Sequence, residues 1–145
     1  MTRLNVYSRR QALAGGAVTA ALPVLGLATP AFAASEAATA TQAVLDHHLG
    51  AFAKGLDEIM RDYSSASVIL THDKQYRGLA EIRSFFDGFL KSVKPGFWEA
   101  FKIQTQSVNR DVAYLVWEAR PFVSLATDTL VVRGKKIVVQ TFTAA

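Results

Sequence analysis

Residues 127–142 read TDTLVVRGKKIVVQTF, and this stretch has a strongly alternating pattern. Apolar and polar side chains alternate on both sides of Gly134-Lys135, which predicts two strands joined by a tight turn. The strands run from Thr127 to Arg133 and from Lys136 to Phe142. The carboxyl-terminal part of the chain is therefore expected to form a β-hairpin.

Two more strands are predicted directly upstream of this hairpin. From Phe97 to Gln104 apolar and polar residues alternate, which indicates a long half-buried strand. Asn109-Arg110-Asp111 then turns the chain into a second strand, Val112 to Arg120. Because four successive strands are joined by short connections, we expect a largely antiparallel sheet.

The preceding residues have the spacing of helices. After a frayed lead-in over 35–41, apolar residues recur every three to four positions up to Gly55, which is placed to end a helix. A short second helix is predicted over 56–63 and a third over 79–90, with a short strand pair between them over 66–77. Three helices on one face of a curved sheet make an α+β domain.

The amino-terminal residues have the pattern of an export signal. Residues 1–33 contain three arginines and no acid, and residues 11–35 carry no charge. Ala31-Phe32-Ala33 fits a signal peptidase site, and Ser8 to Leu13 resembles the twin-arginine export motif of bacteria. A membrane anchor is the alternative, which the glycines and prolines of this segment disfavour. We expect cleavage after Ala33, leaving 34–145 as a single periplasmic or secreted domain.

Charge and cysteine content exclude several classes of function. The chain has a formal charge of +4, but its first 33 residues hold three of the 16 basic residues and none of the 12 acids. The remaining domain is therefore close to neutral, which argues against a nucleic-acid partner. The absence of cysteine excludes disulfides, thiolate metal sites and cysteine nucleophiles. Three histidines without ligand spacing predict no metal, and no cofactor motif is present.

The order of elements resembles the nuclear transport factor 2-like superfamily, in particular its SnoaL-like and ketosteroid-isomerase-like members. The resemblance covers about Thr41 to Phe142. Three segments carry it: Lys54-Gly55-Leu56-Asp57, Tyr76 to Arg83 and Thr127 to Val138. It implies a cone-shaped, curved, largely antiparallel sheet with three helices on its concave face, a fold also called cystatin-like.

The resemblance also implies a partner and a ligand. Members of the superfamily commonly form homodimers through the sheet, and Lys102, Gln104 and Gln106 are then expected to line that contact. The open end of the cone holds a pocket for a small apolar ligand. No stable membrane anchor is expected.

Candidate site residues follow from ketosteroid isomerase, in which a carboxylate base works beside an oxyanion hole of tyrosine and protonated aspartic acid. His48 lies where that tyrosine is found, seven residues before Gly55, and is able to donate a hydrogen bond or move a proton. The alternative is a histidine bonded to a neighbouring carbonyl. His47 points about 100° away on the helix and is expected to be solvated.

Asp128 corresponds to the aspartic acid of the oxyanion hole. Alternation places it on one strand face with Leu130 and Val132, where burial would raise the pKa of its carboxyl group. The alternative is an aspartate at a strand start that bonds nearby backbone amides.

The catalytic base of ketosteroid isomerase has no counterpart, because Leu70 stands at its position. His72, Asp73 and Glu118 are the alternatives, although His72-Asp73 is typical of a turn and Glu118 is placed to pair with Arg120.

Five aromatic residues are candidate pocket walls, with the ordinary apolar core as their alternative: Tyr63, Tyr76, Phe86, Trp98 and Trp117. The sequence thus favours a cofactor-free isomerase or lyase that transfers a proton on an apolar carbonyl compound, including cyclases and dehydratases. The alternative function is a non-catalytic ligand-binding or dimeric interaction module.

Overall fold

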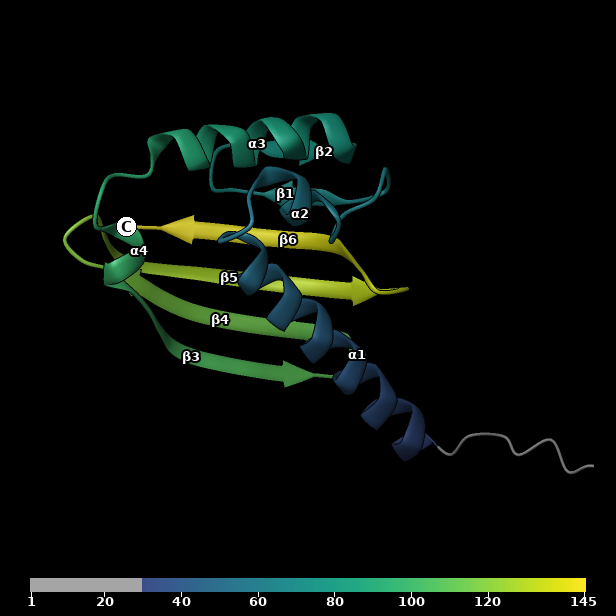
Figure 1. The fold of residues 1–145 in the computed structure, drawn as a ribbon. Coiled ribbons are helices and arrows are strands. Elements are labelled where there is room, and N and C mark those ends of the chain that lie inside the picture. The colour runs from purple at the N-terminus through teal and green to yellow at the C-terminus, as the bar shows by residue number, and fades with distance from the viewer. Residues whose placement is uncertain (1–29) are drawn as a thin grey trace, which may run out of the picture.

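A computed structural model describes residues 30–145; the predicted signal peptide lies outside the described residues apart from residues 30–33. The described part contains four helices and six strands (Figure 1). In chain order they are α1 (Pro30–Ala51), α2 (Leu56–Met60), β1 (Val68–Leu70), β2 (Gln75–Arg77), α3 (Gly78–Ser92), α4 (Phe97–Ala100), β3 (Phe101–Asn109), β4 (Val112–Ala119), β5 (Val123–Arg133) and β6 (Lys136–Ala144).

The six strands form one curved sheet in the order β2-β1-β6-β5-β4-β3. Every neighbouring pair is antiparallel except β1 and β6, so the predicted largely antiparallel sheet is confirmed. The final hairpin turns at Gly134 and Lys135, whose φ angles of 55° and 62° bring Arg133 opposite Lys136. Two consecutive positive φ angles suit the twist of a two-residue hairpin.

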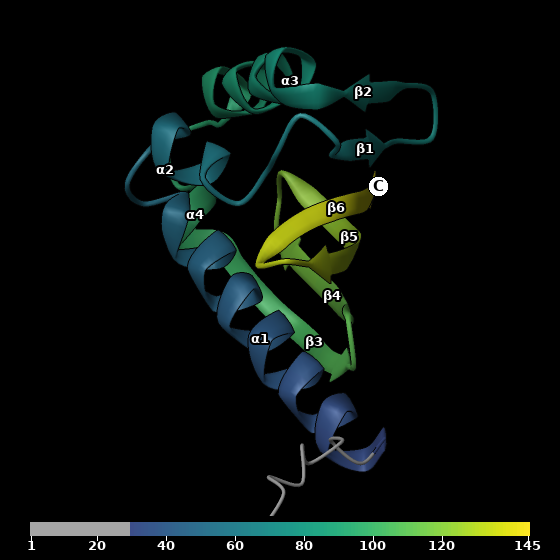
Figure 2. The same ribbon diagram turned by 90° about the vertical axis from the view of Figure 1, so that its right-hand side faces the viewer.

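Helices cover the concave side of this sheet. Figure 2 shows α1 running obliquely beside β3, β4 and β5, and α3 lying over β1 and β2 at the other end. The short α2 contacts both α1 and α3. The expected α+β architecture is therefore present, and the core lies between the helices and the sheet.

Two element boundaries differ from the prediction. Helix α1 already begins at Pro30, so the expected frayed lead-in over 35–41 is wrong; alanine is the strongest helix former and dominates this segment. The strand predicted from Phe97 starts with the one-turn helix α4, after Gly96 at φ 85°. Phe97 and Phe101 are four residues apart, a spacing that fits a helix as well as a strand.

A bulge in β3 changes which side chains share a face. The register shifts between Ile103 and Thr105, so that Lys102 pairs with Glu118 while Gln106 pairs with Leu115. Successive positions of β4 point to opposite faces, and Glu118 and Leu115 are three positions apart. Their partners Lys102 and Gln106 therefore also point to opposite faces. Lys102 and Gln106 do not share one sheet face, and their part in a contact between two copies stays a prediction. Pairing of two copies through the sheet stays a prediction.

Candidate functional site

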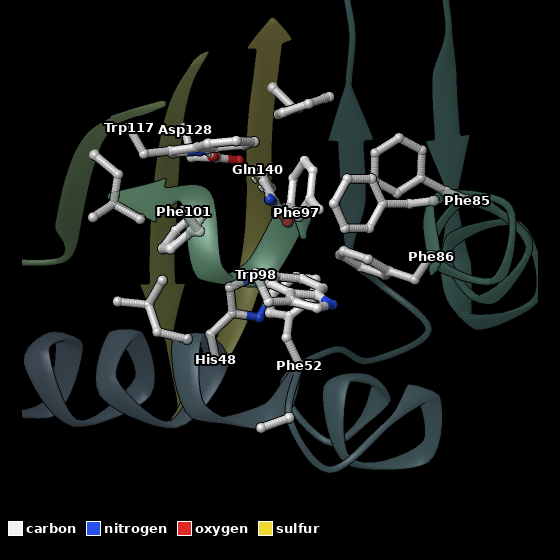
Figure 3. Close-up of a pocket in the computed structure, with 15 residues that line it drawn as sticks. His48, Phe52, Phe85, Phe86, Phe97, Trp98, Phe101, Trp117, Asp128 and Gln140 are labelled. Carbon is white, nitrogen blue, oxygen red and sulfur yellow. Dashed lines mark hydrogen bonds between the residues drawn. The ribbon is translucent and has the colours of Figure 1, made fainter. Parts of the chain in front are cut away.

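A cavity of about 370 Å³ lies between the concave sheet face and helices α1, α3 and α4 (Figure 3). Nine of its 15 lining residues are Phe or Trp, and among the lining residues only three carry polar side chains. The lining residues are His48, Leu49, Phe52, Ala53, Phe85, Phe86, Phe89, Phe97, Trp98, Phe101, Leu115, Trp117, Asp128, Gln140 and Phe142. This size and composition suit a small, largely apolar organic ligand.

Asp128 on β5 is the centre of the polar cluster on the sheet side. Trp117 Nε1 on β4 donates a hydrogen bond of 2.7 Å to Asp128 Oδ2, and Gln140 Nε2 on β6 donates one of 2.8 Å to Oδ1. Tyr63 Oη donates to Gln140 Oε1, which fixes the orientation of the amide. Both donors to Asp128 are side chains from neighbouring strands, so the alternative of a strand-start aspartate bonding backbone amides is wrong.

Burial governs the protonation of Asp128. The residue is 8% exposed, and desolvation raises the pKa of its carboxyl group above the usual value of 3.8. The hydrogen bonds from Trp117 and Gln140 and the nearby His48 act in the opposite direction, since they favour the charged form. Alternation along β5 does place Asp128 on the buried face with Leu130 and Val132. The structure thus gives this carboxyl group an elevated proton affinity inside an apolar cavity.

His48 approaches the cavity from α1, on the side opposite Asp128 (Figure 3). Its Nδ1 lies 3.1 Å from Oδ2 of Asp62, and its ring packs edge-to-face against Phe52 and Phe86. An ionised carboxylate only accepts hydrogen bonds, so Nδ1 carries the proton and Nε2 is left without a partner among the described residues. The alternative of a bond to a neighbouring carbonyl is wrong.

Asp62 was not among the residues predicted for the site. It follows α2, its side chain is 6% exposed, and its backbone carbonyl accepts a hydrogen bond of 2.8 Å from Ile137 N. That bond ties the segment to β6 and holds the carboxylate beneath α1. The available signal was its position three residues after Ile59 in the helix predicted over 56–63, where that spacing puts an acid on the apolar side.

His47 reaches solvent as predicted, with its side chain 34% exposed, but it is also held by two carboxylates that the sequence did not predict. Its Nδ1 lies 2.6 Å from Asp62 Oδ1 and its Nε2 lies 2.9 Å from Glu58 Oε1. These bonds exist because Gly55, at φ 102° and ψ −179°, turns the chain so that α2 returns along α1. Helical geometry places adjacent side chains about 100° apart, but one carboxylate lies between His47 and His48 and contacts both.

The predicted aromatic walls divide into two groups. Phe86, Trp98 and Trp117 line the cavity, whereas Tyr63 and Tyr76 do not. Tyr63 donates a hydrogen bond to the lining residue Gln140 without lining the cavity itself. Tyr76 on β2 packs against a phenylalanine of α3. The prediction missed Gln140. It also missed six phenylalanines of the lining: Phe52, Phe85, Phe89, Phe97, Phe101 and Phe142. The first three of these lie on helical faces with apolar spacing.

No replacement for the missing carboxylate base lies at the cavity. Leu70 is not a lining residue. His72 and Asp73 form an exposed pair in the turn between β1 and β2, with Nδ1 and Oδ1 3.7 Å apart. Glu118 pairs with Arg120 at 2.9 Å, as predicted from their spacing. The histidine and the aspartate in the cavity lining are therefore His48 and Asp128, without any of these three alternatives.

Within 30–145 there is no cluster of three or more histidine, aspartate and glutamate side chains able to hold a metal ion. No helix in this range is long and apolar enough to cross a membrane.

Comparison with known proteins gives matches only at the level of structure. No family model and no curated protein matches the sequence. A nuclear transport factor 2-like protein of unknown function from Mesorhizobium loti aligns with a TM-score of 0.62 at 14% identity, covering 74% of this chain and 93% of that one. A SnoaL-like protein of unknown function from Burkholderia thailandensis aligns with a TM-score of 0.59 at 13% identity, covering 74% and 95%. The chain has the nuclear transport factor 2-like fold.

A nuclear transport factor 2-like protein of unknown function from Burkholderia xenovorans aligns with a TM-score of 0.60 at 13% identity, covering 74% of this chain and 84% of that one. The nuclear transport factor 2-like fold predicted from the order of elements is thus confirmed. Since one fold hosts many chemistries, function has to be argued from the side chains at the cavity.

Proposed function

We propose that the protein binds a small, apolar, carbonyl-bearing compound in this cavity and transfers a proton on it without a cofactor. One observation carries the proposal: His48 and Asp128, a base and a buried acid, face one aromatic cavity from opposite sides. Isomerisation, cyclisation and dehydration all need a base at carbon and an acid at oxygen.

His48 is assigned as the base. With the proton on Nδ1 held by Asp62, the lone pair of Nε2 takes a proton from the carbon next to the carbonyl group. The carbon–hydrogen bond breaks, its electron pair forms the enolate, and His48 becomes an imidazolium ion. The Asp62 carboxylate stabilises that cation and fixes the ring orientation, as a carboxylate does behind a catalytic histidine in hydrolases.

Asp128 is assigned as the acid. In its protonated form it donates a hydrogen bond to the carbonyl oxygen and stabilises the enolate. Trp117 and Gln140 hold its two oxygen atoms in place, so the group is oriented before the ligand arrives. The proton on His48 then returns to carbon or oxygen, which decides between isomerisation and elimination.

Deuterium exchange at the carbons next to the carbonyl group of β-tetralone, followed by proton NMR in D₂O, tests this assignment. We expect the full chain to accelerate the exchange, and His48→Gln and Asp128→Asn each to lower the catalysed rate by about 100-fold or more. His72→Gln and Asp73→Asn are matched controls in an exposed turn and should leave the rate unchanged. Unaltered exchange in His48→Gln would remove the histidine from the mechanism.

A binding module is the second candidate, because 12 of the 15 lining residues are apolar. Its signature is tight binding of the fluorescent naphthyl ketone prodan, seen as a blue-shifted emission, without exchange on any cyclic ketone. That combination would replace the enzymatic proposal by ligand binding alone.

We also propose that residues 1–33 direct export and are removed. The sequence pattern of this segment supports it, and so does the burial pattern of α1. The buried residues of that helix begin at Thr41, and residues 30–33 are exposed. Of the residues that the structure describes, cleavage after Ala33 therefore removes none that belongs to the core.

A further inference from the structure

The carboxylate of Asp62, beneath α1, is hydrogen-bonded to two histidines that are adjacent in the chain. Asp62 Oδ1 lies 2.6 Å from His47 Nδ1, and Oδ2 lies 3.1 Å from His48 Nδ1. The Asp62 side chain is 6% exposed, and these two rings are its side-chain hydrogen-bond partners among the described residues. The His48 side chain is 4% exposed and lines the cavity, whereas that of His47 is 34% exposed and reaches solvent. His47 at the surface and His48 at the cavity therefore share one carboxylate, that of Asp62.

His47 has a second acidic partner on its outer side. Its Nε2 lies 2.9 Å from Glu58 Oε1, so a protonated ring donates to a carboxylate from each nitrogen. The hydrogen bonds to Glu58 and Asp62 raise the pKa of His47 above its usual 6.5. Two cations also contact Glu58, Arg61 at 3.1 Å and Lys54 at 3.8 Å. The two carboxylates thus stabilise the charged form of His47 relative to the neutral form.

His48 meets different groups. Asp62 lies at Nδ1, the neutral phenol of Tyr63 packs edge-on at a centroid distance of 5.9 Å, and Asp128 is the acid on the far side of the cavity. Desolvation raises the pKa of Tyr63 well above its usual value, so its phenol is neutral and adds no charge beside the His48 ring. Of these groups, only Asp62 is hydrogen-bonded to His48.

We propose that His47, held by Glu58, is a positioning residue that keeps the cavity histidine His48 in its neutral form by neutralising the carboxylate that both rings share. While His47 is charged, Asp62 accepts the Nδ1 proton of His48 as a hydrogen bond without drawing a second proton onto Nε2. When His47 loses its proton, the full charge of Asp62 acts on His48 and increases its proton affinity. The two protonations oppose each other, as coupled sites do.

The meaning of this coupling for catalysis rests on the proposed function, since a neutral Nε2 is what the proposed base requires. The coupling itself does not, because it concerns only the protonation of the protein without a ligand. A surface histidine would then tune the pH range in which the cavity base is available.

Proton NMR titration of the full chain without ligand tests the coupling. The chain has three histidines, so single His→Gln variants assign all three ring Cε1–H signals. In His47→Gln we expect the titration midpoint of the His48 signal to rise by about one pH unit, since a nearby cation has been removed. In Glu58→Gln it should rise less, because His47 then holds its proton less firmly.

Asp62→Asn should shift the His48 midpoint in the opposite direction, to lower pH, because the anion itself is gone. His72→Gln is the matched control and should leave the midpoint unchanged. A His48 midpoint that stays the same or falls in both His47→Gln and Glu58→Gln overturns the proposal. Glu58 is a partly exposed helix residue outside the core, so this second variant keeps the test valid where His47→Gln fails to fold.

The pH profile of β-tetralone exchange separates this inference from the proposed function. If the profile of His47→Gln shifts to higher pH along with the His48 signal, both hold. If the signal shifts but no variant catalyses exchange, the coupling stands and the enzymatic assignment fails.

Discussion

At the scale of single residues, the polar side chains of the cavity are positioned by partners on other elements. Gln140 is oriented by Tyr63 from the segment after α2 and in turn donates to Asp128 on β5. Among the described residues, every side-chain nitrogen or oxygen that is fully enclosed has a hydrogen-bond partner, and the free Nε2 of His48 belongs to a residue that lines the cavity. Such satisfied networks hold one geometry, because any rotation would leave a buried group unpaired.

The His47 contacts predict a pH dependence of stability. The pKa of His47 is raised, so its contribution is complete below pH 6.5 and is lost as pH rises through the folded value. The pKa of Glu58 is lowered, chiefly by His47, so its contribution is complete above pH 4.5 and is lost as pH falls through the folded value. Urea unfolding of the wild type and His47→Gln should differ most between pH 4.5 and 6.5. A constant difference from pH 4 to 9 would contradict the ion pair.

At the scale of elements, Gly55 determines where α2 and the acids that follow it lie. Its conformation, φ 102° and ψ −179°, belongs to a region that is essentially restricted to glycine. Because the chain reverses there, Glu58 and Asp62 reach the histidines of α1. A connection of four residues, 52–55, thus places both acids beside the first helix.

Two glycine substitutions five residues apart should therefore have opposite effects on stability. Gly55→Ala should destabilise the fold by about 1–3 kcal/mol, the cost of the strained backbone. Gly50→Ala, inside α1, should stabilise it by about 0.5–1 kcal/mol, since alanine is the better helix former. A Cβ at either position has nothing within 4 Å, so backbone conformation alone separates them. Equal changes in the denaturant midpoint would refute this explanation.

At the scale of the whole molecule, the order and pairing of the strands create the cavity. The central strands β4, β5 and β6 bring Trp117, Asp128 and Gln140 side by side on the concave face, and α1 places His48 opposite them (Figures 1 and 3). The helices cover the sheet without filling the space between them, so aromatic side chains remain exposed to the cavity.

The export proposal predicts the form in which the protein accumulates. Amino-terminal sequencing of exported material should begin at Ala34, and residues 34–145 should unfold at the same temperature as the full chain. The reason is that α1 buries its first side chain only at Thr41. Intact chain retained in the membrane fraction would refute cleavage.

The sequence predicted the element order, the final hairpin and the inward face of Asp128, because alternation and helical spacing report directly on local geometry. It also predicted the position of His48, through the resemblance. It erred at Phe97, where helical and strand spacing coincide, and it did not predict the bulge that puts Lys102 and Gln106 on opposite faces. Both differences have a local cause that residue type does not reveal.

The sequence by itself therefore determined the fold, its largely antiparallel sheet and an apolar interior with one acid on its inner face. Only the tertiary structure decided what surrounds the two candidate catalytic groups. The Asp62 carboxylate contacts residues 14 and 15 positions away, and Gln140 joins Tyr63 across 77 positions. Such contacts arise from the packing of whole elements against one another, whereas periodicity records only which side of a single element is buried.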